Sequence, residues 1–251
     1  RAPARLFPAL AGVVEDASGT VRAVAELTWT SSGRPDGRAE VAFSDVDVTA
    51  AGVTAKAING VVAFDGLVPP SLPPGQTIAV GLLDVGVPLV NGVIEFGLSR
   101  AGVLGIERAE WNWAGGVIFA EPFSADFAQS SWQTTLGARD LDLGAVLAIA
   151  DVAGLAGTGT LAGRLPLRLD FATVEIEGGR LEATGPGTLN YVPRDAEGLG
   201  SGQAGTALVL DALGNFHYDS LAMTIDGTAG GEATVGLRLV GRNPDLYGGY
   251  P

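Results

Sequence analysis

The residues of this chain that could do chemistry are few. His217 is the only histidine, and it lies between Phe216 and Tyr218 with Asp219 two positions further on. A Ser-His-Asp hydrolase also needs an activated serine, and the sequence has no Gly-x-Ser-x-Gly motif to supply one. His217 and Asp219 share one face of a predicted strand, because strand side chains alternate between the two faces. The pattern therefore favours a structural histidine.

Acidic pairs and one glycine-rich turn give weak signals for metal and phosphate binding. Asp45-x-Asp47 and Asp140-x-Asp142 resemble fragments of calcium loops, but the remaining ligands and the distal glutamate are missing at the required spacing. Gly157-Thr158-Gly159 precedes a β pattern, whereas a phosphate site needs a helix N-terminus there. The sequence therefore predicts no enzyme activity, no catalytic residue, no metal site and no cofactor.

The composition narrows the class of protein. The chain has 251 residues, a formal net charge of −13 and no cysteine. The negative charge argues against nucleic acid and against electrostatic docking on anionic membranes. The missing cysteines exclude disulfides and thiolate metal sites. No apolar run reaches the ~18 to 20 residues of a membrane span, and the first residues do not resemble a secretory signal. An export signal or anchor of the full protein would lie outside this chain.

Alternation of apolar and polar residues predicts a mainly β fold. Leu161, Leu165, Leu167 and Leu169 share one parity, and Arg164 with its neighbours of like parity occupies the other. The same stretch continues through Val174 and Ile176. Gly178-Gly179 and Gly185-Pro186-Gly187 then predict two tight turns between neighbouring antiparallel strands.

Two breaks in parity predict local irregularities in strands. Val46 has the opposite parity to Phe43, which predicts a bulge or bend near Ser44-Asp45. A second change of face is predicted near Asp219-Ser220, between Tyr218 and Leu221.

Short helices are predicted at three places. One begins near Pro8 and ends by Gly19; a second follows Asp142 as cap, with Leu143, Val146, Leu147 and Ala150 on one side; a third spans roughly 203–213 and ends at Gly214. Because they are short, we expect two or three of them to cover a sheet edge or end within a single unit spanning 1–251. The proline-rich segment 67–76 cannot be an interior strand and is the best internal boundary.

Several blocks of the sequence resemble the carboxy-terminal part of the YdbH-like family. The most specific are RDLDLGAVL, AGLAGTGTLAGRLPLRL with EIEGGRLEATGPGTLNYVP, LGNFHYDSLAMTIDG and GEATVGLRLVGRNPDLYGGYP. Segments of the earlier half, such as INGVVAFDGL, are similar but less distinctive. The family is a dicarboxylate-transport domain related to AsmA-like bridge proteins, which are thought to carry phospholipid between the two membranes of Gram-negative bacteria.

The resemblance implies a fold, a location and a partner. The fold would be an elongated, twisted antiparallel sheet curled into a U-shaped apolar groove, in the periplasm, with the full-length protein anchored in the inner membrane. A small outer-membrane lipoprotein similar to YnbE would add strands to the carboxy-terminal edge. Because the family pattern continues past residue 251 and its anchor is absent here, we expect this chain to be a fragment.

The resemblance also implies that the apolar residues of like parity line the groove. The expected function is a periplasmic lipid-transfer segment that shields phospholipid acyl chains; the alternative is an envelope assembly module, like the related TamB proteins, that guides unfolded β-strands of outer-membrane proteins. The lipid-groove candidates are Leu27, Trp29, Phe43, Val80, Leu82, Ile94, Phe96, Leu98, Leu104, Ile106, Trp111, Trp113, Leu161, Leu165, Leu167, Leu169, Val174, Ile176, Leu189, Tyr191, Leu221, Met223, Ile225, Val235, Leu237 and Leu239. The partner-edge candidates are Val235, Leu237, Leu239, Leu246, Tyr247 and Tyr250.

Overall fold

A computed structural model describes residues 14–29, 35–50, 52–149, 152–170, 173–192, 204–228 and 231–246. Within them are two short helices, α1 (Leu143–Ile149) and α3 (Ala204–Leu213). The strands are β1 (Val14–Trp29), β2 (Pro35–Ala50), β3 (Val53–Phe64), β4 (Gly66–Leu67), β5 (Pro70–Asp84), β6 (Pro88–Leu98), β7 (Val103–Trp113), β8 (Gly116–Ala120), β9 (Phe123–Asp126), β10 (Ser131–Asp142), β11 (Leu155–Thr158), β12 (Thr160–Asp170), β13 (Val174–Ala183), β14 (Gly187–Tyr191), β15 (Phe216–Thr228) and β16 (Ala233–Arg242).

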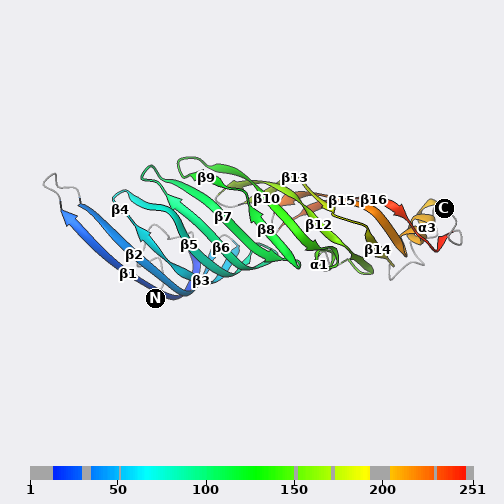
Figure 1. The fold of residues 1–251 in the computed structure, drawn as a ribbon, viewed down its shortest axis with the longest axis horizontal. Helices are drawn as coiled ribbons and strands as arrows, with labels where there is room; N and C mark the ends of the chain where they lie inside the picture. The colour runs from blue at the N-terminus through cyan, green and yellow to red at the C-terminus, as the bar shows by residue number, and fades with distance from the viewer. Residues whose placement is uncertain are drawn as a thin grey trace.

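The described strands form one long antiparallel sheet. Twelve of them lie side by side in the order β1-β2-β3-β5-β6-β7-β8-β10-β12-β13-β15-β16, so chain order and spatial order nearly coincide. At ~4.8 Å between neighbours, these strands extend on the order of 50 Å across the sheet. Figure 1 shows the strands stacked along the long axis from the N-terminal to the C-terminal end. The prediction of a mainly β, elongated antiparallel sheet is confirmed.

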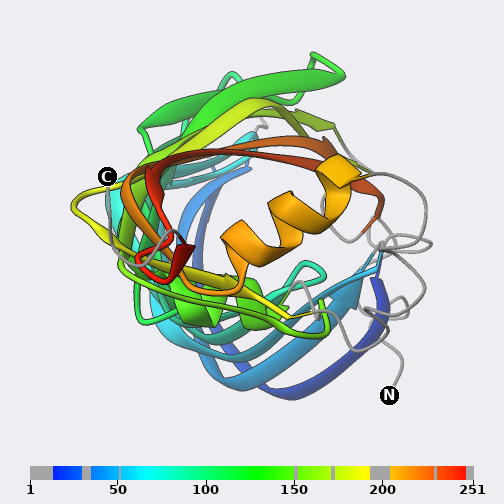
Figure 2. The same ribbon diagram turned by 90° about the vertical axis from the view of Figure 1, so that its right-hand side faces the viewer.

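The sheet curls around its long axis, as the view along that axis shows (Figure 2). A series of bulges accompanies the curl: Asp45 in β2, Ala57 in β3, Asn91 in β6 and Asp140 in β10 all have positive φ angles, between 48° and 57°. Each bulge inserts a residue, bends its strand and increases the local twist. The predicted irregularities near Ser44-Asp45 and Asp219-Ser220 are confirmed, because the strand register shifts at both places.

The two predicted glycine turns near residues 178 and 186 are wrong. β13 continues through Gly178 without a turn. The register shifts there and φ is 67°, so this glycine lies in a bulge. β13 and β14 do not pair with each other; both pair with β15 in the same direction, so 184–186 is a break within one long strand. β11 and β12 are broken in the same way at Gly159 and pair with β14 and β13. Paired glycines let a strand bend as readily as turn, and only the pairing distinguishes these outcomes.

The helices agree with the sequence in part. Asp142 Oδ1 accepts a hydrogen bond from the Ala145 N–H at 2.7 Å, which confirms the predicted cap of α1. α3 lies within the predicted 203–213 helix. The predicted amino-terminal helix is wrong where the structure describes it, because Val14–Gly19 belongs to β1. Pro8 and Ala150 lie outside the described residues.

The proline-rich segment holds strand as well as connection. β4 pairs with the start of β5, and β5 then pairs with both β3 and β6. Pro73 and Pro74 lie where the register between β5 and β6 shifts, between Leu72 and Gln76. The prolines thus occupy the irregular beginning of β5, and full pairing on both sides begins at Ile78.

Candidate functional site

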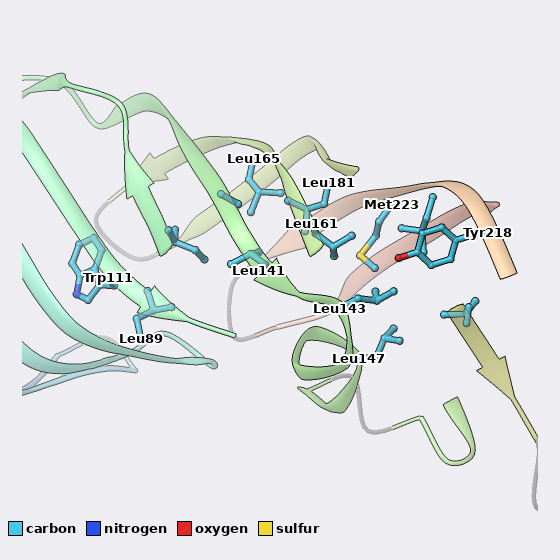
Figure 3. Packing of buried hydrophobic residues seen from close by; sticks show 14 of the residues in the cluster. Leu89, Trp111, Leu141, Leu143, Leu147, Leu161, Leu165, Leu181, Tyr218 and Met223 are labelled. Carbon is cyan, nitrogen blue, oxygen red and sulfur yellow. The ribbon is translucent and has the colours of Figure 1, made fainter. Parts of the chain in front are cut away.

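One face of the sheet is apolar along its whole length. Residues paired across antiparallel strands lie on the same face. Chains of pairs such as Trp111 with Ile118 in β7–β8, and Gly163 with Leu181 and Met223 in β12–β13–β15, connect the apolar positions of successive strands. We call this surface the inner face. Figure 3 shows labelled side chains of this face directed into the space that the curled sheet surrounds.

The register places the candidate residues of the sequence on this face with one exception. Leu82 pairs with Val90, and Val90 pairs with Asn112, which lies between Trp111 and Trp113 in β7. Leu82 therefore belongs to the opposite, outer face. The bulges near Ala57 and Asn91 lie in the neighbouring strands at this level, and a bulge reverses the alternation on which the sequence prediction relied.

The outer face carries charges. Among the described residues, ion pairs on it join Arg108 and Arg139 to Glu110, Arg164 to Glu121, Arg168 to Glu177, and Arg180 to Glu182. A hydrogen bond from Arg108 is the main cause that holds the pKa of the Glu110 carboxyl below its ordinary value. The two faces therefore differ sharply in polarity, and the outer face is suited to water.

Exposure of the inner face varies along the sheet. Leu27 and Trp29 in β1 are 58% and 72% exposed, and Val235 and Leu237 in β16 are also exposed. The other candidates are half-buried or buried. The buried ones are Val80, Trp111, Leu161, Leu165, Leu167, Leu189, Leu221 and Met223. The inner face is thus open on the two edge strands, β1 and β16, and largely covered on the strands between them.

The tightest packing surrounds α1. Leu141 precedes the helix, Leu143 and Leu147 lie on it, and they pack with Leu161, Leu181 and Tyr218 in one buried cluster. We call these six residues the closed cluster. Figure 3 shows Leu143 and Leu147 on α1 facing the strands that carry the other members. Of these six residues, only Leu161 was among the predicted site residues.

The Tyr218 hydroxyl makes a hydrogen bond in a closely packed site. Its side chain is 1% exposed, and its hydroxyl donates a 2.8 Å hydrogen bond to the Thr158 carbonyl oxygen. Gly159 and Gly187 lie against that hydroxyl, where a Cβ on either residue would overlap it. Burial raises the pKa of the Tyr218 hydroxyl. This contact joins β15 to β11 at the level where the long strands break.

The tryptophans of the inner face differ in their polar contacts. Trp132 Nε1 donates to the Asp126 carbonyl oxygen at 3.0 Å, whereas the buried Nε1 atoms of Trp111 and Trp113 have no hydrogen-bond partner among the described residues. The Trp111 indole lies directly over Gly92 of β6. Gly92 therefore leaves the space that the Trp111 ring occupies, which a Cβ would fill.

Chemistry-bearing side chains do not come together in the described part of the chain. His217 lies on β15, and its Nε2 is 3.2 Å from Asn215 Oδ1. Over the described ranges, there is no group of three or more His, Cys, Asp or Glu side chains that could hold a metal ion. Among these same residues, no helix is long and apolar enough to cross a membrane.

The fold and the inner face define the class: an elongated, curled antiparallel sheet with one apolar and one charged surface. The family model that matches is YdbH-like, described as intermembrane phospholipid transport protein YdbH, and it covers residues 1–251. The chain therefore belongs to the YdbH-like family, as the sequence blocks predicted. No curated protein and no solved structure matched the chain.

Proposed function

We propose that this chain is a section of a periplasmic bridge along which phospholipids move between the inner and outer membranes. The family supports lipid transfer, and the observation that carries the bridge is the inner face, which continues over twelve adjacent strands. Acyl chains lie on this face, and headgroups stay in water. We also propose that the full-length protein is anchored in the inner membrane.

The energetics suit movement along the face. Burial of a methylene group stabilises by about 0.8 kcal/mol, so full shielding of an acyl chain of about 16 carbons would give roughly 12 kcal/mol. An apolar face open on its edge strands provides only part of that shielding. The remaining exposure keeps binding reversible.

A matched pair of valines tests this function. Val235 and Val240 both lie on β16 and are both 54% exposed, but Val235 is on the inner face and Val240 on the outer face. A photo-crosslinking residue at each position should give phospholipid adducts at 235 and at least tenfold fewer at 240. Equal lipid labelling would refute the role of the inner face. Adducts with unfolded outer-membrane proteins in place of lipid would favour the assembly function.

The proposal extends to the partner at the carboxy-terminal edge. β16 pairs with β15, and its other edge has no strand partner within the described residues. An unpaired edge accepts a further strand, here from a small outer-membrane lipoprotein similar to YnbE. Leu246 lies just beyond β16, whereas Tyr247 and Tyr250 lie outside the described residues.

A lysine on an edge strand discourages strand addition, which gives a test with a matched control. Val240→Lys on β16 should weaken capture of the lipoprotein at least fivefold. Val24→Lys, at an exposed outer-face valine of the opposite edge strand β1, should leave capture unchanged. Equal effects of the two substitutions on capture would refute the proposal that the lipoprotein docks on β16.

A further inference from the structure

The inner face is interrupted at α1. Leu141, Leu143 and Leu161 are 0% exposed, and Leu181 and Tyr218 are 1% exposed. On the amino-terminal side of this cluster, Ile94 and Phe96 on β6 remain half-buried on the same face. Side chains packed at the density of a protein interior leave no space for an acyl chain. A lipid that follows the inner face therefore meets a closed segment.

The closed cluster is completed by a short helix that follows β10 directly. α1 has seven residues, and its apolar contact with the neighbouring strand β11 centres on Gly157, where a Cβ would lie 3.0 Å from a terminal methyl of both Leu143 and Leu147. The Leu143 N–H donates a 2.9 Å hydrogen bond to the Gly159 carbonyl oxygen, whereas the Asp142 cap is a contact within the first turn of the helix. Displacing α1 would leave the ladder from β10 through β12 and β13 to β15 intact, because α1 provides none of its pairs.

We infer that α1 is a plug that divides the lipid path, and that Leu143 and Leu147 decide whether an acyl chain can cross from the β6–β7 side to the β13–β15 side. This inference rests on the proposed lipid transfer and specifies where it is controlled. With α1 in this position, the apolar side chains of the closed cluster cover one another. With α1 displaced, Leu161 and Leu181 become the surface on which the chain slides.

A reversible lock tests the plug directly. The protein contains no cysteine, so a pair introduced as Leu147→Cys and Gly157→Cys is the only thiol pair present. The Leu147 side chain lies against the Gly157 position, so this is the pair chosen for a disulfide between α1 and β11, and loss of free thiol on oxidation verifies that the bond has formed. The probe is a diazirine-bearing phosphatidylethanolamine in mixed vesicles, and labelled residues are mapped by mass spectrometry. Single Leu147→Cys protein under the same oxidation is the control.

Labelling of Ile94 and Phe96 should be the same in the oxidised and reduced double variant. Labelling of Leu161 and Leu181 should fall at least tenfold on oxidation and return on reduction. Equal labelling of Leu161 and Leu181 in both states, or none in either, overturns the plug. Absence of lipid adducts from the whole inner face, Ile94 and Phe96 included, overturns the proposed function instead.

A second variant covers the case in which the disulfide disturbs folding. Leu147→Ala shortens the plug without a crosslink and should raise labelling of Leu161 severalfold, while labelling of Ile94 stays constant. Circular dichroism verifies that the β content is retained. Unchanged labelling of Leu161 in a folded Leu147→Ala protein would also overturn the plug.

Discussion

Replacement of Tyr218 by phenylalanine isolates one part-buried hydrogen bond, which joins β15 to β11. The ring stays in its place between Gly159 and Gly187, and only the 2.8 Å bond to the Thr158 carbonyl oxygen is lost. The Tyr218 side chain is buried but Thr158 is exposed, so water can reach the acceptor, and loss of the hydrogen bond should cost its usual net contribution of about 0.5–1.5 kcal/mol. For a chain of this size, each kcal/mol lowers the melting temperature by about 2–4 °C. We therefore expect Tyr218→Phe to lower the melting temperature by about 1–6 °C.

The control is Tyr191→Phe. Tyr191 is half-buried on the same face, and its hydroxyl has no hydrogen-bond partner among the described residues. Its substitution should change the free energy of unfolding by less than about 0.5 kcal/mol. Denaturant unfolding of both variants measures the difference. A Tyr218→Phe protein as stable as the wild type would refute the assigned hydrogen bond.

The pH dependence gives an independent check on Tyr218. Burial raises the pKa of its hydroxyl above the unfolded value of about 10. The unfolded tyrosine therefore loses its proton first, and the contribution of Tyr218 to stability is complete below pH 10 and declines as the pH rises through the folded pKa. The advantage of the wild type over Tyr218→Phe should thus narrow above about pH 10. A constant difference between the two proteins up to pH 11 would argue against burial of the hydroxyl.

Three further substitutions test packing, tryptophan contacts and charge. Gly92→Ala places a methyl group against the Trp111 indole and should cost about 1–3 kcal/mol, whereas Gly105→Ala, with open space around its Cα, should be near neutral in the same unfolding assay. Trp132→Phe loses the hydrogen bond to the Asp126 carbonyl oxygen, whereas the indole nitrogen of Trp113 has no partner among the described residues. Trp132→Phe should therefore lower the free energy of unfolding by about 1 kcal/mol more than Trp113→Phe. Equal losses of stability would contradict the assigned hydrogen bond. Glu110→Gln should lower the free energy of unfolding by less than about 1 kcal/mol at pH 7, because the ion pairs of Glu110 are partly exposed. The difference in stability between the variant and the wild type should vanish as the pH falls from about 4.3 through the lowered pKa of Glu110. A difference that persists at pH 2 would show that the ion pairs are not its source.

Alternation along the strands was sufficient to predict the mainly β fold and most of the inner face. A strand side chain has only two directions, so a parity once set by Leu161, Leu165 and Leu167 assigns a whole strand. Parity also located the bulge at Asp45 and the shift at Asp219, because an inserted residue reverses the alternation. The blocks of sequence around these strands were sufficient to identify the family.

Only the tertiary structure decided which strands pair and which apolar residues stay open. Gly178 and Gly185 allow either a turn or a bend, and the hydrogen-bonded partner in β15 makes them a bulge and a break. The same parity includes Leu27, which is exposed, and Leu161, which is fully covered, because burial depends on what lies opposite after the sheet has curled. The closed cluster around α1 arises in this way. Local pattern determines the face of a side chain, whereas contacts between distant segments determine whether that face is filled.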